Sequence, residues 1–494
     1  MHCCYNPVNA EQISRLTQQG LKMTEAAQRG RFGTKIGIVL ATAGSAVGLG
    51  NIWRFPTQAG ENGGSAFILI YLVCIVALGL PLMIAEMVVG RRARACSGKA
   101  FVVLAPNTNW KWLGLFTVLI PFLILSYYNV VAGWVLAYVF DALAGNFVAL
   151  GQQVTPENDP FSDNFTGFIT NPYMPVLFLV IFMFMTHYVI VRGVERGIEK
   201  FSKVLMPVLF LLMIMLVISA LTMPGAKAGL TFLFYPDFSA IDSSVVLSAL
   251  GQCFYSMSLG MGVIITYASY YRKDASLPKS AFSVAGVDTI VAIMAGIIIF
   301  PAVFSVPDLE PNQGPSLVFI ALPNVFNSVL SGIPVLAYLV PLLFYLLLTI
   351  ATITSTMCLH EVVTAFISEH YNISRAKAAF FVSGGTIFLG VLCSLSFGPL
   401  AGFTLFGMNL FDLFDYTTAK LMLPIAGLFT CAFVGWRMRL ISLWKELTSY
   451  GQVKFIGIGL FLIAMRYIAP ILIILIMLSE LGLLNLIADT VLLR

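Results

Sequence analysis

Residues 46–56, AVGLGNIWRFP, place two glycines, an amide and a cation inside a long apolar stretch. Gly48 and Gly50 favour an interruption of the helix, while Asn51 and Arg54 are costly at bilayer depth because no water hydrogen-bonds them there. A second apolar stretch is interrupted in the same way at residues 256–262, SMSLGMG. Loosened backbone in a membrane persists only where protein or a water-filled cavity satisfies it, so both interruptions predict a buried site.

Each interruption offers two kinds of binding group. The N-terminal end of a half-helix carries partial positive charge and suits an anion such as a carboxylate. Freed carbonyls, together with the oxygens of Asn, Ser and Thr, suit a hard cation. One interruption can therefore hold an anionic substrate and an alkali cation side by side.

Carboxylates occur in other apolar stretches of the chain. Asp288, in AGVDTIVAIMAG, is a functional candidate because a carboxylate at bilayer depth is costly. Glu86, Glu361 and Asp415 have the same status for the same reason. For Glu86 and Glu361 an alternative stays open, which is that they satisfy loosened backbone nearby.

Two further features have a structural alternative. Thr354 and Ser355 offer hydroxyl ligands, but hydroxyls in membrane helices also bond to their own backbone. Gly44 and Gly48 form a GxxxG pattern, which by itself indicates close helix packing. Because polar residues accompany the glycines at both interruptions, we favour a binding site over packing alone.

Sequence patterns typical of catalysis are absent. His360 and Glu361 begin a HExxH pattern, but Thr364 stands where the second zinc-binding histidine would be. The sequence contains neither a GxSxG nucleophile motif nor a GxxxxGK[ST] phosphate loop. We therefore expect a protein that is not an enzyme and that draws on an ion gradient rather than on ATP.

The composition predicts an all-α polytopic membrane protein. The 494 residues are 59% hydrophobic and 10% charged, with a mean hydropathy of +0.91, which no water-soluble domain of this size can bury. Apolar windows of about 20 residues, enough to cross a bilayer, predict eleven spans. They lie near residues 36–60, 65–89, 113–143, 174–191, 203–222, 244–271, 281–304, 334–367, 376–396, 404–435 and 454–478.

Positive charge alternates between the two sides of these spans. The segments before span 1 and after each even-numbered span are basic, whereas the alternate segments 144–173, 222–243, 305–333 and 397–403 contain one lysine, Lys227. Cytoplasmic loops collect Lys and Arg, so we expect a cytoplasmic N-terminus and a C-terminus outside. The net charge of +5 then reflects topology, and no nucleic-acid partner is expected.

No hydrophilic linker divides the chain, which predicts one membrane domain over residues 29–478. A polar cytoplasmic segment, residues 1–28, precedes it, and a short extracellular tail, residues 479–494, follows it. Residues 1–22 are a candidate for an overextended start, because Met23 lies close to span 1. The eight cysteines form no pattern that predicts a disulfide or a metal site.

The two interrupted spans, 1 and 6, are five spans apart and so cross the membrane in opposite directions. Interrupted segments at matching positions of two inverted halves are typical of the binding site of a secondary transporter. The predicted inverted repeats cover about residues 36–222 and 244–435.

With these motifs assembled, the chain resembles the neurotransmitter:sodium symporter family, in its bacterial amino-acid-transporting branch with the LeuT fold. The similarity runs from about Arg29 to the end of span 11. It rests on GSAVGLGNIWRFP, ENGGSAF, RGVERGIEKFSKVLMP, GQCFYSMSLGMGVIITYASY and TSTMCLHE. It implies a 5+5 inverted repeat with discontinuous helices 1 and 6, and a bacterial inner-membrane location. The family's twelfth span is missing here.

The resemblance implies two sodium sites, and two ions are favoured over one. The first site takes the Ala46 carbonyl, Asn51, Ser256 and Asp288, and the substrate carboxylate completes it. The second takes the carbonyls of Gly44, Val47 and Ala351 and the hydroxyls of Thr354 and Ser355.

The resemblance also implies a substrate cradle and two gates. The cradle consists of Ala46, Gly48, Leu49, Gly50, Tyr128, Tyr255, Ser258, Met261, Ser355, Thr356 and Leu359. The outer gate pairs Arg54 with Asp415, with Gln252 beside them and Phe319 above. The inner gate pairs Arg29 with Glu369, supported by Tyr270, although Arg31 is an alternative to Arg29.

Two positions narrow the implied function. Monoamine-transporting relatives have an aspartate where this chain has Gly48, so we expect a substrate with its own carboxylate, an amino acid. Chloride-dependent relatives have an asparagine at the position of Asp288, whose fixed charge here predicts chloride independence. A pliable Met261 and aromatic Tyr128 and Tyr255 favour a hydrophobic or aromatic side chain.

The leading hypothesis is therefore a sodium-coupled symporter that imports a neutral L-amino acid by alternating access, with spans 1, 2, 6 and 7 rocking against the rest. The alternative is a transporter-like sensor that binds an amino acid without net transport. The expected partners are the amino acid and the lipid bilayer, with no obligate protein partner.

Overall fold

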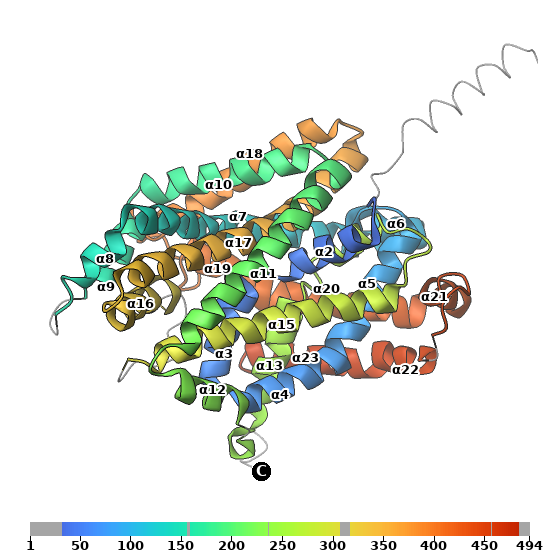
Figure 1. Cartoon of the computed structure of the whole chain (residues 1–494). Coiled ribbons are helices and arrows are strands. Elements are labelled where there is room, and N and C mark those ends of the chain that lie inside the picture. The colour runs from blue at the N-terminus through green and yellow to red at the C-terminus, as the bar shows by residue number, and fades with distance from the viewer. Residues whose placement is uncertain (1–31, 156–158, 236, 307–316, 456, 484–494) are drawn as a thin grey trace, which may run out of the picture.

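The computed structural model describes residues 32–155, 159–235, 237–306, 317–455 and 457–483, and every regular element in these ranges is a helix (Figure 1). The elements in the predicted spans are α2 (Lys35–Ala46), η1 (Gly50–Arg54) and α3 (Phe55–Glu61); α4 (Ser65–Cys74), η2 (Ile75–Gly79) and α5 (Leu80–Ala93); α7 (Lys111–Ala144); α10 (Met174–Val191); η3 (Val194–Glu199) and α11 (Lys200–Leu221); α13 (Ser243–Ser256) and α14 (Val263–Ala268); α15 (Leu277–Val303); α17 (Pro334–Tyr371); α18 (Arg375–Leu395); α19 (Leu410–Tyr416), η6 (Thr417–Met422), α20 (Leu423–Ala432) and η7 (Phe433–Arg437); α22 (Ile458–Ile463), η8 (Ala464–Ile468) and α23 (Ala469–Glu480). The connecting helices are α6 (Ser97–Leu104), α8 (Asn146–Gly151), α9 (Pro160–Thr170), α12 (Ala226–Phe234), η4 (Phe238–Ala240), η5 (Leu317–Ala321), α16 (Leu322–Leu330) and α21 (Leu440–Leu447).

These helices make a multi-pass membrane protein, as the composition predicts. Within the described residues, nine helical stretches are long and apolar enough to cross a bilayer, and the bent pair of residues 36–46 and 50–61 makes up to ten. α13 and α14 have 14 and 6 residues, too few to cross singly. The count of eleven spans therefore stays a prediction.

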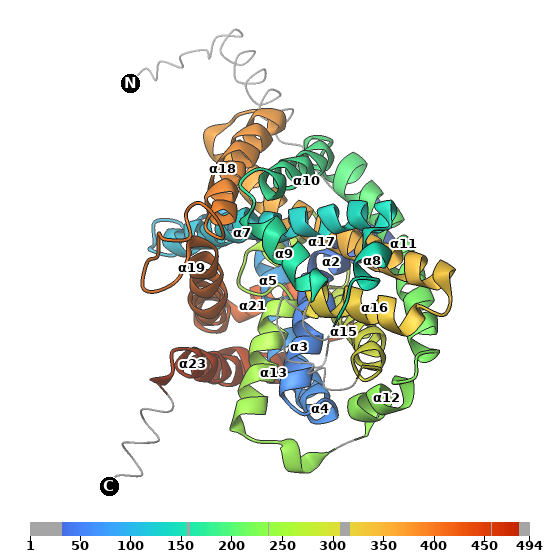
Figure 2. The same ribbon diagram turned by 90° about the vertical axis from the view of Figure 1, so that its left-hand side faces the viewer.

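Helices far apart in the sequence pack side by side. α7 and α17 contact each other, and both contact α10 and α18. α2 lies against α11, α15 and α17, while α14 lies against α5 and α13 against α4. Figure 2 shows α10 and α18 on one side of the molecule and α4 and α12 on the opposite side, with α2 and α17 between them. The broken spans thus lie inside the bundle.

The first half of span 6, α13, begins at an aspartate cap. The Asp242 carboxylate accepts hydrogen bonds from the Ser244 hydroxyl, at 2.6 Å, and from the Val245 amide, at 2.9 Å. These hydrogen bonds hold the pKa of Asp242 below its usual range. A charged cap there also favours the positive end of the helix dipole.

The second half of span 6, α14, packs directly on the backbone of α5 at Gly90. A Cβ atom built on Gly90 would lie 1.9 Å from the carbonyl oxygen of Ile265 in α14. No side chain can move aside to relieve this contact, because the clashing atom belongs to the backbone. Gly90 is therefore required for α5 and α14 to approach.

We expect Gly90→Ala to force α14 away from α5 and to lower the Tm in detergent by several degrees. Gly286→Ala, within α15, is the matched control, because its Cβ meets no atom within 4 Å. The helix propensity of alanine exceeds that of glycine by about 1 kcal/mol, so the control should keep or raise the Tm. Equal melting temperatures of the two variants would contradict the close approach.

Candidate functional site

The interruption of span 1 lies between α2, which ends at Ala46, and η1, which begins at Gly50. Side chains take over the backbone groups freed there. The Gly48 amide donates to Asn51 Oδ1, at 3.1 Å, and the Leu49 amide to Tyr128 Oη, at 3.2 Å. These contacts satisfy donors that would be costly to leave unpaired in a buried site.

The interruption of span 6 uses left-handed backbone, with φ of +55° at Ser258 and +78° at Gly260. A Cβ at Gly260 would lie 2.5 Å from the Leu423 carbonyl oxygen, so both the conformation and the close approach require glycine. The Gly260 amide donates to Glu86 Oε1 at 2.7 Å. Glu86 therefore satisfies loosened backbone, the alternative left open from the sequence.

Three residues of the predicted first sodium site meet in one buried cluster. Asn51 Nδ2 donates to Asp288 Oδ1 at 2.7 Å and to Ser256 Oγ at 3.1 Å. Ser256 Oγ donates to Asp288 Oδ2 at 2.8 Å, and Tyr71 Oη approaches the same oxygen at 3.3 Å. Asn51, Asp288 and Tyr71 are fully buried. The cluster concentrates carboxylate, amide and hydroxyl oxygens, which are the ligands that hard cations take.

Residues of the predicted second sodium site also lie together, around α2 and α17. Ser355 Oγ donates to the Val47 carbonyl at 3.1 Å, and Thr354 Oγ1 donates to the Ala351 carbonyl at 2.9 Å. A Cβ at Gly44 would lie 3.5 Å from Thr354 Cβ. The Thr354 bond is the local backbone bond considered as an alternative, whereas Ser355 connects α17 to the interruption of span 1.

The two interruptions line one cavity of about 40 Å³. Of the predicted cradle, its walls contain Ala46, Gly48, Gly50, Tyr128, Tyr255, Ser258, Met261, Ser355 and Leu359. The volume has room for about three water molecules, so a large substrate requires the lining to move. Gly48 faces this cavity, because a Cβ there would lie 2.5 Å from Ser355 Oγ and 3.1 Å from Tyr128 Oη.

Two predicted cradle residues do not line the cavity. Leu49 contributes its amide to Tyr128 Oη. Thr356 is turned toward α10, where its hydroxyl lies 2.9 Å from Thr186 Oγ1. Successive residues of a helix point about 100° apart, so Thr356 and the cavity-lining Ser355 face different neighbours.

The sequence analysis missed four lining residues, Ser45, Ile124, Val263 and Cys358. Helical spacing offered a signal for two of them. Ile124 lies four residues before Tyr128 on α7, and Cys358 lies three residues after Ser355 on α17. Residues three or four apart share one face of a helix, so each could have been found from a neighbour already identified.

The predicted outer-gate residues face one another without an ion pair between Arg54 and Asp415 in the part of the chain described here. The Arg54 guanidinium carbon lies 4.5 Å from the ring centroid of Tyr255. Gln252 Nε2 donates to the Gly50 carbonyl at 2.8 Å. Gln252 thus satisfies a carbonyl at the beginning of η1 rather than contacting Arg54.

Phe319, placed above the outer gate by the sequence, belongs to a buried aromatic cluster. It stacks on Phe165, with ring centroids 5.1 Å apart, and packs edge-on against Trp134 and Tyr138. Tyr138 Oη also donates to the Phe319 carbonyl at 3.0 Å. The cluster joins η5 to α7 and α9.

At the opposite end, the predicted inner gate is described in part. Arg29 and Arg31 lie outside the described residues. Glu369 Oε2 accepts a hydrogen bond from the Cys96 amide at 3.3 Å, and Tyr270 Oη donates to Glu361 Oε1 at 2.6 Å. Glu361 is fully buried and pairs with Arg375. It therefore serves an ion pair, not the loosened backbone that the sequence offered as its alternative.

Comparison with known proteins places this site in a family. The profile of the sodium:neurotransmitter symporter family matches residues 29–154 and 165–487. An uncharacterised sodium-dependent transporter of Bacillus subtilis (strain 168) is 37% identical over 92% of this chain and 98% of its own length. A similar transporter of Haemophilus influenzae is 33% identical over 93% of this chain and 99% of its own length.

A solved structure agrees with these sequence matches. The crystal structure of MhsT in complex with L-phenylalanine superposes with a TM-score of 0.82 at 42% identity, covering 92% of this chain and 100% of that one. The relatives are transporters, which agrees with the absence of catalytic motifs. The chain is a sodium-dependent transporter with the LeuT fold and belongs to the sodium:neurotransmitter symporter family.

Proposed function

We propose that this protein imports a neutral, hydrophobic or aromatic L-amino acid together with two sodium ions, by alternating access. The buried cluster of Asn51, Ser256 and Asp288 beside a cavity at two interrupted spans carries the proposal. The cluster would bind the first ion and the oxygens near Val47, Thr354 and Ser355 the second.

The substrate class follows from charge and from two relatives. Gly48 leaves the cavity wall without a carboxylate, so a bound amine would lack a counter-ion, whereas an amino acid brings its own carboxylate. MhsT was crystallised with L-phenylalanine. Rat B(0)AT3, a sodium-dependent neutral amino acid transporter, is 32% identical over 55% of this chain and 48% of its own length.

The remaining parts of the proposal concern the gates and the orientation. The basic segments support a cytoplasmic N-terminus and a C-terminus outside, in the bacterial inner membrane. Arg54 and Asp415 would pair when the outer side closes, since both lie beside Tyr255. Glu369 and Tyr270 would belong to the inner gate, with Arg29 as the proposed partner of Glu369.

Reconstituted into liposomes with an inward sodium gradient, the protein should accumulate labelled phenylalanine, and potassium in place of sodium should abolish accumulation. Competition by the twenty amino acids should be strongest for those with apolar or aromatic side chains. Sodium-dependent binding without flux would contradict symport and would favour the sensor.

Uptake should keep its rate when gluconate replaces chloride at constant sodium, because the fixed charge of Asp288 stands at the cation cluster. Asp288→Asn should lower the apparent sodium affinity by about tenfold or more, since tenfold corresponds to about 1.4 kcal/mol and a buried charge contributes more than that. Loss of wild-type uptake in gluconate would show that the carboxylate does not replace chloride.

Gly48→Ala should raise the KM for the amino acid by about tenfold, because overpacking of a filled site costs about 1–3 kcal/mol. Gly44→Ala, one turn earlier on α2, is the matched control: its Cβ would meet its nearest atom, Met206 Sδ, at 3.4 Å. We measure uptake against substrate concentration for both variants. Equal KM values would mean that Gly48 does not face the substrate.

A further inference from the structure

A second cavity, of about 690 Å³, lies away from the interrupted spans, between α6, the end of η7 and α21. Four cations line it, Arg92, Arg437, Arg439 and Lys445. Arg437, Arg439 and Lys445 are exposed, and none of them pairs with a carboxylate in the described parts of the chain. Like charges gathered in one cavity repel each other, so the site favours an anion.

The same cavity has an apolar wall. Val103, Leu104, Phe433 and Ile441 line it beside the cations. Val103 is 54% exposed and Ile441 is 63% exposed, so this wall is not covered by the protein. A small soluble anion would leave these side chains unused, whereas an amphiphile would contact both the cations and the wall.

The surroundings place the cavity at the level of lipid headgroups. Trp436 and Trp444 are exposed beside it, as is Leu440 at the beginning of α21. Tryptophan is enriched at the membrane–water interface, and a short helix with exposed apolar residues and basic flanks lies along that interface. In the proposed topology this interface is the cytoplasmic one, where basic pockets between spans bind anionic lipid headgroups.

We propose that this cavity binds an anionic phospholipid, with its phosphate at Arg437, Arg439 and Lys445 and its acyl chains along the apolar wall. The inference depends on the proposed membrane orientation and not on the identity of the transported amino acid. It assigns a lipid site to a surface formed by α6, η7 and α21.

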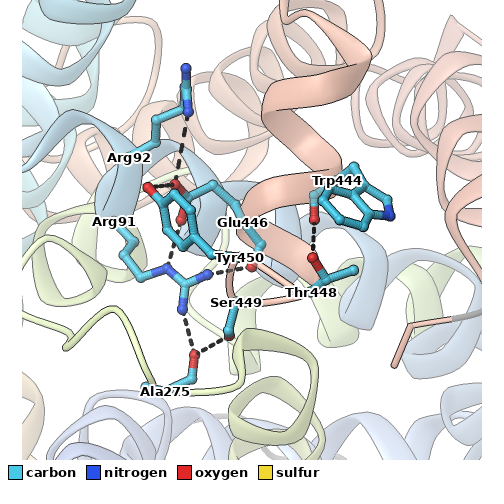
Figure 3. A network of polar contacts seen from close by, with 8 residues as sticks. All are labelled: Arg91, Arg92, Ala275, Trp444, Glu446, Thr448, Ser449 and Tyr450. Atoms are coloured by element: carbon cyan, nitrogen blue, oxygen red, sulfur yellow. Dashed lines mark hydrogen bonds and ion pairs between the residues drawn. The ribbon is translucent and has the colours of Figure 1, made fainter. Parts of the chain in front are cut away.

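The floor of the cavity is fixed by a buried network around Glu446 (Figure 3). Arg91 Nε lies 2.7 Å from Glu446 Oε2, and Arg92 Nη1 lies 3.9 Å from Oε1. Tyr450 Oη donates to the same Oε1 at 3.2 Å. Arg92 and Tyr450 thus belong to both the cavity and the network, so a headgroup in the cavity contacts residues that hold α21 on α5.

The network extends to the segment between α14 and α15. Arg91 donates to the Ala275 carbonyl, and Ser449 Oγ donates to the same oxygen at 2.9 Å. The Glu446 side chain is 2% exposed, so this ion pair is shielded from solvent and salt. A lipid bound on α21 is therefore expected to stabilise the contact between α21, α5 and the beginning of α15.

The test compares lipid retention by native mass spectrometry in detergent that contains equal amounts of phosphatidylglycerol and phosphatidylcholine. Wild-type protein should retain phosphatidylglycerol about tenfold over phosphatidylcholine, given three cations near one phosphate. The triple variant Arg437→Gln, Arg439→Gln and Lys445→Gln should lose this preference. The triple variant Lys200→Gln, Lys279→Gln and Lys377→Gln removes the same charge from exposed positions elsewhere and should keep it.

A second measurement needs no variant. Phosphatidylglycerol should raise the Tm of the wild-type protein above its value in phosphatidylcholine, and soluble glycerol phosphate should not. Equal effects of glycerol phosphate would identify a site for a free anion, and an unchanged preference in the first triple variant would place the lipid elsewhere. Either result overturns the proposal, and neither depends on transport, whose failure would be seen separately in the uptake experiment.

Discussion

Backbone hydrogen bonding at membrane depth is the constraint on which the rest of this structure depends. An intact helix satisfies its own amides and carbonyls, but the interruptions of spans 1 and 6 release several of each. Side chains of other helices take them: Tyr128 from α7, Ser355 from α17, Glu86 from α5 and Gln252 from α13. Each interruption is therefore stable only inside the assembled bundle.

The contacts that satisfy the interruptions fall into two groups. The bond from Gly260 to Glu86, like those joining Asn51 to Ser256 and Asp288, connects spans 1, 2, 6 and 7 to one another. The bonds from Leu49 to Tyr128 and from Ser355 to Val47 connect span 1 to α7 and α17. In a rocking motion of the first four spans, the first group would persist while the second would break and re-form.

The sequence was sufficient for the parts of the site that depend on local chemistry. Glycines beside polar residues predicted both interruptions, and the cost of a buried carboxylate singled out Asp288, which meets Asn51 and Ser256 as expected. Rotation about a helix axis could not be predicted, because it depends on neighbours distant in sequence. Thr356 therefore turned to α10 rather than to the cavity.

Partners of buried charges were equally difficult to foresee. Glu361 pairs with Arg375, which follows on the next helix, α18, and no local pattern connects them. The separation of Arg54 from Asp415 depends on the relative position of spans 1 and 10. A single sequence encodes several such positions, so it predicts which residues can meet but not which state brings them together.

Charge provides the physical connection between the proposed ion and the proposed substrate. Asp288 is fully buried, and an amino acid in the adjacent cavity would bring a second carboxylate into a region with low dielectric constant. Two buried negative charges repel unless a cation lies between them. A sodium ion at the Asn51–Asp288 cluster would therefore favour the substrate, and by linkage the substrate would favour sodium equally. Coupling of the two then needs no additional device, because the cluster and the cavity share the interruption of span 1.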